Sequence, residues 1–140
     1  MSIPEKVVKT MYQNDAFSQW LGINVVEVKD GYCKLKLNIR DEMLNGFQIA
    51  HGGIAYSLAD SALAFASNSR GRKSLSVETS ISHTVSVKAG DELTAMTKEL
   101  SLSDKIGVYL ITITNQDNQE VAYFKGSVYR TSNDWIPESK

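Results

Sequence analysis

Residues 51–69 form a stretch rich in Ala, Leu and Ser that carries one carboxylate, Asp60, and no Lys, Arg or second acid. This composition is typical of a helix that is apolar on nearly every face, and such a helix belongs in the interior of a fold. An Asp is rarely buried there alone, because taking its charge out of water is costly unless the charge is paired or hydrogen-bonded. Asp60 is therefore held for a function, or it lies where the helix meets a cleft.

The predicted helix opens on two glycines, Gly52 and Gly53. Gly53 lies seven residues before Asp60, which is two helical turns, so both residues point along the same face. The first backbone N–H groups of a helix have no partner within the helix, and they suit a developing negative charge. Amide donors and a carboxylate that face one cleft predict a hydrolytic site.

The composition limits the domain organisation and the partners of the chain. A length of 140 residues predicts one domain, 1–140, with a core of its own. The net charge of −1 gives no sign of nucleic-acid binding, and a single cysteine cannot form an internal disulfide. We find no metal-binding motif, no leader with a cleavage site and no stretch long enough to cross a bilayer. We therefore expect a cytoplasmic protein without a metal or membrane anchor.

The hydrophobic periodicity predicts an α+β fold. Ser2 and Glu5 form a candidate capping box for a short first helix, and an apolar patch at Phe17, Trp20 and Leu21 precedes the first strand. The strands are expected over 22–28, 33–40, 75–85, 93–102, 106–115 and 121–131, with turns at 30–31 and 88–91. Strands on both sides of one long apolar helix indicate an antiparallel sheet wrapped around that helix, which is the hotdog fold.

Alternation within the strands separates buried positions from exposed ones. Cys33 falls with the apolar set of its strand and is interpreted as a core thiol, since no basic partner is adjacent. In strand 75–85 the apolar face is expected to hold Leu75, Val77, Thr79, Ile81, His83 and Val85. His83 is interpreted as a core or interface histidine and left outside the site. Glu78 is either a second acid near the pocket or part of a solvated face.

Three segments around the apolar helix form a specific set of motifs. They are Asn45-Gly-Phe-Gln-Ile-Ala-His51-Gly52-Gly53, then Ser57-Leu-Ala-Asp60-Ser-Ala, then Asn68-Ser69. Together they resemble the active-site region of hotdog-fold acyl-CoA thioesterases, most of all the phenylacetate-degradation (PaaI-type) branch. The similarity continues more loosely through 89–95, 114–116, 121–126 and 129–130, so it spans most of the chain from Asn45 onward. His-Gly-Gly alone is a weak signal, whereas these motifs at these spacings are a specific one.

The resemblance implies a role for each matching residue. Asp60 matches the family's catalytic carboxylate and Gly52 the amide that polarises the carbonyl, while Asn45 and His51 match supporting polar residues. Gly53 and a strand hydroxyl at Ser76 fall in the substrate-binding region, although residues 75–84 depart from the branch's usual sequence. The family needs no cofactor. Its sites lie at a dimer interface, with Asp60 facing Asn45 and Gly52 of the partner chain, which implies a homodimer or a tetramer acting on an acyl-CoA.

Other interpretations stay open. Taken alone, Asn45 fits a turn residue, and His51 fits a hydrogen-bonding residue at a helix start. Instead of a thioesterase, the chain could be a non-catalytic acyl-CoA-binding or regulatory module, or a hydratase on the same scaffold. A binder has no use for a costly carboxylate, and a hydratase would carry a His a few residues after Asp60. An apolar pocket for an aryl-acetyl or medium-chain acyl group is predicted from Phe47, Ile54, Tyr56, Leu63 and Phe65.

Overall fold

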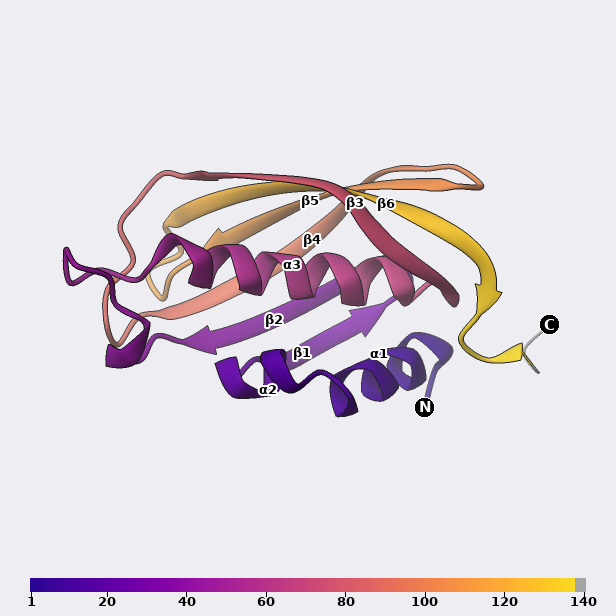
Figure 1. Ribbon diagram of the computed structural model, residues 1–140, viewed down its shortest axis with the longest axis horizontal. Helices are drawn as coiled ribbons and strands as arrows, with labels where there is room; N and C mark the ends of the chain where they lie inside the picture. The colour runs from indigo at the N-terminus through magenta and orange to yellow at the C-terminus, as the bar shows by residue number, and fades with distance from the viewer. Residues whose placement is uncertain (138–140) are drawn as a thin grey trace.

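The long apolar segment forms a single helix, α3 (Gly52–Asn68), and a six-stranded antiparallel sheet curves around it (Figure 1). The computed structural model describes residues 1–137. The strand order is β1-β2-β4-β5-β6-β3, so β1 and β3 are the two edges of the sheet. The predicted α+β architecture is thus confirmed.

The remaining elements follow the expected order along the chain. Two short helices come first, and a 3-10 helix precedes α3. The helices are α1 (Ile3–Gln13), α2 (Ala16–Leu21) and the 3-10 helix η1 (Asp41–Met43). The strands are β1 (Asn24–Lys29), β2 (Tyr32–Asn38), β3 (Arg72–His83), β4 (Glu92–Leu102), β5 (Ile106–Thr114) and β6 (Glu120–Asp134).

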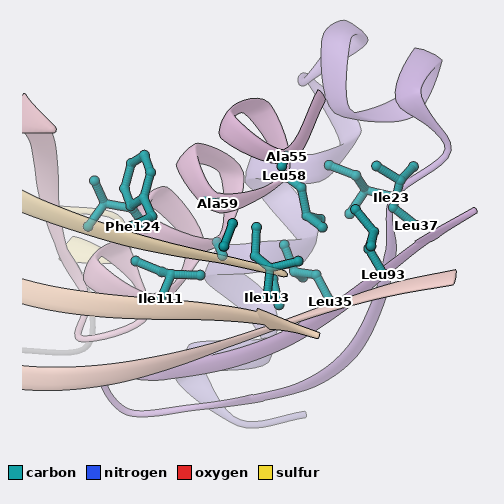
Figure 2. Packing of buried hydrophobic residues seen from close by; sticks show 14 of the residues in the cluster. Ile23, Leu35, Leu37, Ala55, Leu58, Ala59, Leu93, Ile111, Ile113 and Phe124 are labelled. Carbon is teal, nitrogen blue, oxygen red and sulfur yellow. The ribbon is translucent and has the colours of Figure 1, made fainter. Parts of the chain in front are cut away.

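The core lies between α3 and the concave face of the sheet. Cys33, Leu35 and Leu37 of β2 point into it and alternate with partly exposed lysines, as predicted. Helix α3 contributes Leu58 and Ala59, which pack toward the middle strands (Figure 2). Burial also raises the pKa of the Cys33 thiol, so this cysteine behaves as a packed core residue and not as a nucleophile.

Helix and sheet approach each other closely at Gly126 of β6. A Cβ atom placed on this glycine would lie 2.5 Å from Cδ2 of Leu63, a fully buried residue of α3. The absence of a side chain at 126 therefore makes room for Leu63 and sets how near the helix can lie to this strand.

The N-terminal region differs partly from the prediction. The capping box of α1 is confirmed, because Ser2 Oγ accepts from the Glu5 N–H and the Glu5 carboxylate accepts from the Ser2 N–H. The second apolar patch lies on the short helix α2, and of the three residues of the patch only Leu21 is buried. Phe17 and Trp20 stack on each other with their side chains 53% and 58% exposed, respectively.

In strand β3 the pattern of buried and exposed residues differs from the predicted alternation. A bulge between Ser76 and Glu78 shifts the register against β6, so Ser76 pairs with the buried Val128, and Thr79 pairs with Gly126. Ser76 and Thr79 consequently share the face toward α3, whereas a regular strand would place them on opposite faces. Leu75 and Val77 are 67% and 63% exposed, so the prediction that they lie on the same buried face as Ile81 is wrong.

The C-terminal end of α3 is fastened by the side chain of Asn68. Its amide donates to the carbonyls of Ala64 and Ser74, and its Oδ1 accepts from the Ser74 N–H at 2.9 Å and from Trp135 Nε1 at 2.8 Å. The adjacent Ser69 accepts from the Gly31 N–H in the β1–β2 turn. The Asn68-Ser69 pair therefore joins the helix end to three other parts of the fold. No helix within residues 1–137 is long and apolar enough to cross a membrane.

Candidate active site

Asp60 lies halfway along α3, where the helix surface opens to solvent. Its side chain is partly buried, and within residues 1–137 its carboxylate forms no hydrogen bond or ion pair. Burial raises the pKa of Asp60, and the negative charge of Asp15 raises it further. A carboxyl group with a raised pKa in a cleft is a marker of acid–base function.

Asp15 is fixed near Asp60 by a short hydrogen-bonded chain. Its Oδ1 caps α2 by accepting from the Ser18 N–H, and its Oδ2 accepts from Ser18 Oγ at 2.6 Å. The Ser18 hydroxyl is in turn 2.8 Å from the hydroxyl of Ser61, the residue after Asp60. The capping residue of a surface helix thus contributes charge to the environment of the central carboxylate.

A pocket of about 430 Å³ opens beside Asp60 and is mostly apolar. Ser76 lines it from β3, as the bulge in that strand allows, so the structure brings Ser76 and Asp60 to one cavity. The rest of the lining comes from helix α3, from the start of β3 and from residues distant in sequence. These are Met11, Leu63, Ala64, Ser67, Asn68, Lys73, Ser74, Leu75, Val128 and Trp135.

The start of α3 forms the second part of the candidate site. His51 is the N-cap residue, and its Nδ1 accepts a hydrogen bond from the Gly53 N–H at 3.0 Å. The N–H of Gly52, the first helical residue, has no acceptor within residues 1–137. Of the two glycine amides, Gly52 is therefore the one left to bind an oxyanion. Gly53 instead donates its N–H to the capping side chain of His51. The lack of a side chain at 53 makes room for this contact, because a Cβ there would lie 3.2 Å from His51 Nδ1.

Asn45 organises the loop that leads to this helix. Its Oδ1 accepts from the N–H groups of Phe47 and Ile49, at 2.9 and 3.4 Å, which holds the tight turn containing Gln48 in a left-handed conformation. The turn interpretation of Asn45 is thus confirmed for its oxygen. Its Nδ2 has no partner within residues 1–137, so one donor remains for a ligand.

Asn45, His51 and Gly52 line one pocket of about 280 Å³, and His83 of β3 lines it as well. The Nε2 atom of His83 lies 3.2 Å from the position of a Cβ on Gly52. Of the two interpretations of His83, the core one is therefore wrong, because its side chain is exposed at the start of α3, and the interface one stays a prediction. Periodicity could not show this, because it assigns His83 correctly to the same strand face as Ile81 but does not show that α3 begins only at this point and leaves the side chain uncovered.

The two pockets share no lining residue. Asp60 lies eight residues after Gly52, which corresponds to about 12 Å along the helix axis. One chain thus brings Asn45, His51 and Gly52 together, and separately Asp60 and Ser76, but it does not join the two groups.

The predicted acyl pocket is only partly present. Leu63 lines the cavity at Asp60, but Phe47 is 87% exposed and Phe65 is fully buried in the core. Tyr56 hydrogen-bonds Thr79 and packs edge-on against Phe124 instead. The residues that do form the wall, such as Met11 and Trp135, lie at opposite ends of the chain and carry no shared sequence pattern. Within residues 1–137, no cluster of His, Cys, Asp and Glu side chains has the arrangement of a metal site.

Comparison with known families and proteins places the chain among thioesterases. A model of the thioesterase superfamily matches residues 47–122. The Archaeoglobus fulgidus protein described as a putative esterase is 40% identical over 135 residues, which is 96% of this chain and 88% of that protein. The acyl-coenzyme A thioesterase PaaI of Escherichia coli is 38% identical over 120 residues, 86% of each chain.

Solved structures agree with this assignment. The E. coli PaaI protein from the phenylacetic acid degradation operon superposes with a TM-score of 0.92 and 35% identity, covering 94% of this chain and 96% of that one. A Streptococcus mutans protein bound to acetyl-CoA superposes with a TM-score of 0.77 and 28% identity, covering 80% of this chain and 90% of that one. The predicted hotdog fold and the resemblance to PaaI-type proteins are therefore confirmed.

Proposed function

Because the chain belongs to the thioesterase superfamily, we propose that it acts as an acyl-CoA thioesterase of the PaaI type in which Asp60 activates the nucleophile. The observation that carries this proposal is the carboxylate of Asp60, which is unpaired within residues 1–137 and borders an apolar pocket. A carboxylate without a structural partner is costly to retain on a core helix, and catalysis is a reason to retain it.

In this mechanism Asp60, acting as general base, takes a proton from a water molecule as the oxygen attacks the thioester carbonyl. The carbonyl oxygen becomes negative and accepts a hydrogen bond from the Gly52 N–H at the positive end of α3. When the tetrahedral intermediate collapses, the C–S bond breaks and the proton passes from Asp60 to the leaving thiolate of CoA. As a direct nucleophile, Asp60 would form an anhydride that water then hydrolyses. Both routes require the ionised carboxylate.

The supporting residues complete the carbonyl site. His51 fixes the helix start through its bond to Gly53, so that the Gly52 N–H keeps its direction. Asn45 holds the loop with its oxygen and offers its Nδ2 to the ligand. Ser76 supplies a hydroxyl on the wall opposite Asp60. Ser76 is thereby assigned to substrate binding, whereas Gly53, whose N–H is bonded to His51, supports the helix start.

The active site in this proposal is shared between two chains. Asp60 and Gly52 are too far apart along α3 to act on one carbonyl, so a second copy must bring its own Gly52 and Asn45 toward Asp60. Strand β3 supports this arrangement, because it is a sheet edge on which Leu75 and Val77 are largely exposed. A two-fold partner covers such an edge with the same surface twice and forms two equivalent sites. The proposed assembly is a homodimer or a tetramer of such dimers.

The proposed substrate is an aryl-acetyl- or medium-chain acyl-CoA. The apolar pocket at Asp60 supports an apolar acyl group, and the similarity to PaaI and to the acetyl-CoA-bound S. mutans protein supports a CoA thioester. The proposal treats residues 1–140 as one domain and places the protein in the cytoplasm, where CoA thioesters are available and a free buried thiol such as Cys33 stays reduced. Neither a metal nor an organic cofactor takes part.

The alternative is a non-catalytic acyl-CoA-binding or regulatory module. A thiol-release assay with a panel of acyl-CoAs that includes phenylacetyl-CoA separates the two functions. We expect steady release of CoA that depends on enzyme concentration. Saturable binding of the same acyl-CoAs, measured by calorimetry, without any release of thiol would favour the binding module and reject the thioesterase.

A further inference from the structure

Trp135, near the C-terminus, is held against the end of α3 by three interactions. Its backbone N–H donates to the Gly71 carbonyl at 2.8 Å, and its indole Nε1 donates to Asn68 Oδ1 at 2.8 Å. The ammonium group of Lys73 lies 5.0 Å from the ring centroid. The indole is therefore fixed in place, and its only polar atom is already bonded.

The pocket at Asp60 is lined along one face of α3 and by this indole, which lies at the C-terminal end of the helix. Asp60, Ala64, Ser67 and Asn68 line it at the spacing of successive helical turns, and Trp135 lies beside Asn68. Asp60 and Asn68 are eight residues apart, so the pocket extends about 12 Å along the helix. Met11 of α1 and Val128 of β6 close its sides with apolar atoms.

We propose that Trp135 is the end wall of the acyl-binding site and sets the longest acyl chain that the enzyme accepts. This inference rests on the proposed function, because it takes the thioester carbonyl to lie at Asp60. From there an apolar acyl chain extends along α3 over Ala64 and meets the face of the indole. The site therefore selects compact acyl groups, either medium straight chains or a phenylacetyl group whose ring packs on the indole.

The interactions of Trp135 indicate that its side chain can be replaced without disturbing the fold. The Asn68 oxygen that accepts from the indole also accepts from the Ser74 N–H, so Asn68 does not depend on Trp135 for its place in the fold. Loss of the indole consequently opens the end of the pocket and leaves no buried polar atom of Asn68 without a partner. The acyl-length limit can thus change without a change in the core.

The test measures kcat/KM for butyryl-, hexanoyl-, octanoyl-, dodecanoyl-, palmitoyl- and phenylacetyl-CoA. In Trp135→Ala we expect the ratio of kcat/KM for dodecanoyl-CoA to that for hexanoyl-CoA to rise by about 10-fold or more, since a few methylene groups in a pocket discriminate by that much. Trp135→Phe keeps an aromatic wall and should retain most of the original preference. The matched control is Trp20→Ala, which removes an exposed tryptophan outside the pocket.

A second variant tests the same limit from within the helix. Ala64 lines the pocket between Asp60 and Asn68, so Ala64→Met shortens the available length and should lower the same ratio below that of the unmodified enzyme. The two substitutions thus act in opposite directions, which a general loss of stability cannot reproduce. Melting temperatures of all variants are measured alongside.

Binding provides a readout that does not require turnover. The chain has two tryptophans, so Trp20→Phe leaves Trp135 as the single fluorophore. Binding of octyl-CoA, a thioether that cannot be hydrolysed, should change the fluorescence of Trp135, and binding of CoA alone should not. If acyl-CoAs are hydrolysed but the chain-length ratio is unchanged in both Trp135→Ala and Ala64→Met, the end-wall proposal is rejected and the thioesterase stands. If no acyl-CoA in the panel is hydrolysed by the unmodified protein, the proposed function itself fails.

Discussion

The hydroxyl groups of Ser18 and Ser61 lie 2.8 Å apart and join the short helix α2 to the central helix α3. Both serines are buried, and Ser18 also donates to the carboxylate of Asp15. This contact brings the charge of Asp15 close enough to raise the pKa of Asp60. The helix before the first strand therefore tunes the carboxylate proposed to do the chemistry, although no motif in the sequence connects the two.

Replacing Asp15 with Asn should shift the pH dependence of the enzyme. Asn is also a good N-cap residue, so α2 should keep its start while the negative charge is lost. The pKa of Asp60 then falls, and the acid limb of kcat/KM against pH moves to lower pH, because Asp60 stays ionised further into acid. Asp117→Asn, which removes an exposed charge in the β5–β6 turn, is the control. An acid limb that stays in place in Asp15→Asn would show that Asp15 does not tune this group.

Asp60→Asn should remove most thioesterase activity and leave a folded protein. Asn keeps the shape of the side chain but cannot act as a base, which is worth about 10²–10⁴-fold in rate. Near-normal turnover in the purified variant would mean that Asp60 has no part in catalysis.

The same substitution should stabilise the protein at neutral pH. Folding raises the pKa of Asp60, so between the ordinary Asp value of about 3.9 and the raised value the native state holds a proton that the unfolded chain has lost. The stability of the unmodified protein consequently falls as pH rises through this window. We expect the Tm of Asp60→Asn to exceed that of the unmodified protein above the window and the difference to disappear below it. An unchanged Tm difference across the series would contradict the raised pKa.

Gly52→Pro should abolish turnover while the helix start is retained. Gly52 is the first residue of α3, the helical position that tolerates Pro best, and His51 has the extended conformation (φ −58°, ψ 137°) that a following Pro requires. Loss of one oxyanion donor costs about 10²–10³-fold in related acyl-transfer sites. Gly52→Ala is the matched control, because it crowds His83 in the same way but keeps the N–H. Equal activity of the Pro and Ala variants would reject Gly52 as the donor.

Mixing two inactive variants tests whether the site is shared between chains. Asp60→Asn supplies a native Asn45, and Asn45→Asp supplies a native Asp60 while its carboxylate oxygen still accepts the two loop hydrogen bonds. A heterodimer of the two contains one site with both native residues and one site with both residues replaced. Each heterodimer should therefore recover up to half of the activity of a native dimer. Heterodimers that form but stay inactive would place all of these residues in one subunit. A monomer in light scattering would contradict the shared site directly.

The sequence predicted the arrangement of elements well where one pattern extended over many residues. Alternation at Cys33, Leu35 and Leu37 gave β2 its buried face, and the uncharged segment around Asp60 gave the central helix. Alternation failed in β3, because a bulge at Val77 reverses which residues face the core on one side of it. No residue type in this segment indicates a bulge. The surface position of His83 was missed for another reason, because alternation gives the face of the strand and not the point at which the covering helix begins.

Patterns within the sequence predicted the candidate site only where its residues are local, whereas Ser76, which shares a cavity with Asp60, was placed by the family resemblance. Asn45, His51 and Gly52 lie close together along the chain, and their shared pocket follows from the turn before α3. The wall at Asp60 combines Met11, Val128 and Trp135, which meet through the closure of the sheet around the helix. Such a wall depends on tertiary packing, for which a single sequence offers no periodic signal.

The close approach of Gly126 to Leu63 links two positions that are far apart in the chain. A Cβ at 126 would overlap the Leu63 side chain, and a smaller residue at 63 would leave a void beside a bare strand. A substitution at either position alone therefore destabilises the fold. A smaller side chain at 63 combined with a larger one at 126 keeps the total side-chain volume between helix and strand. Across related sequences we expect the two sites to covary as a compensating pair, large with small, so that the helix keeps its distance from the sheet while the residues that set it are replaced.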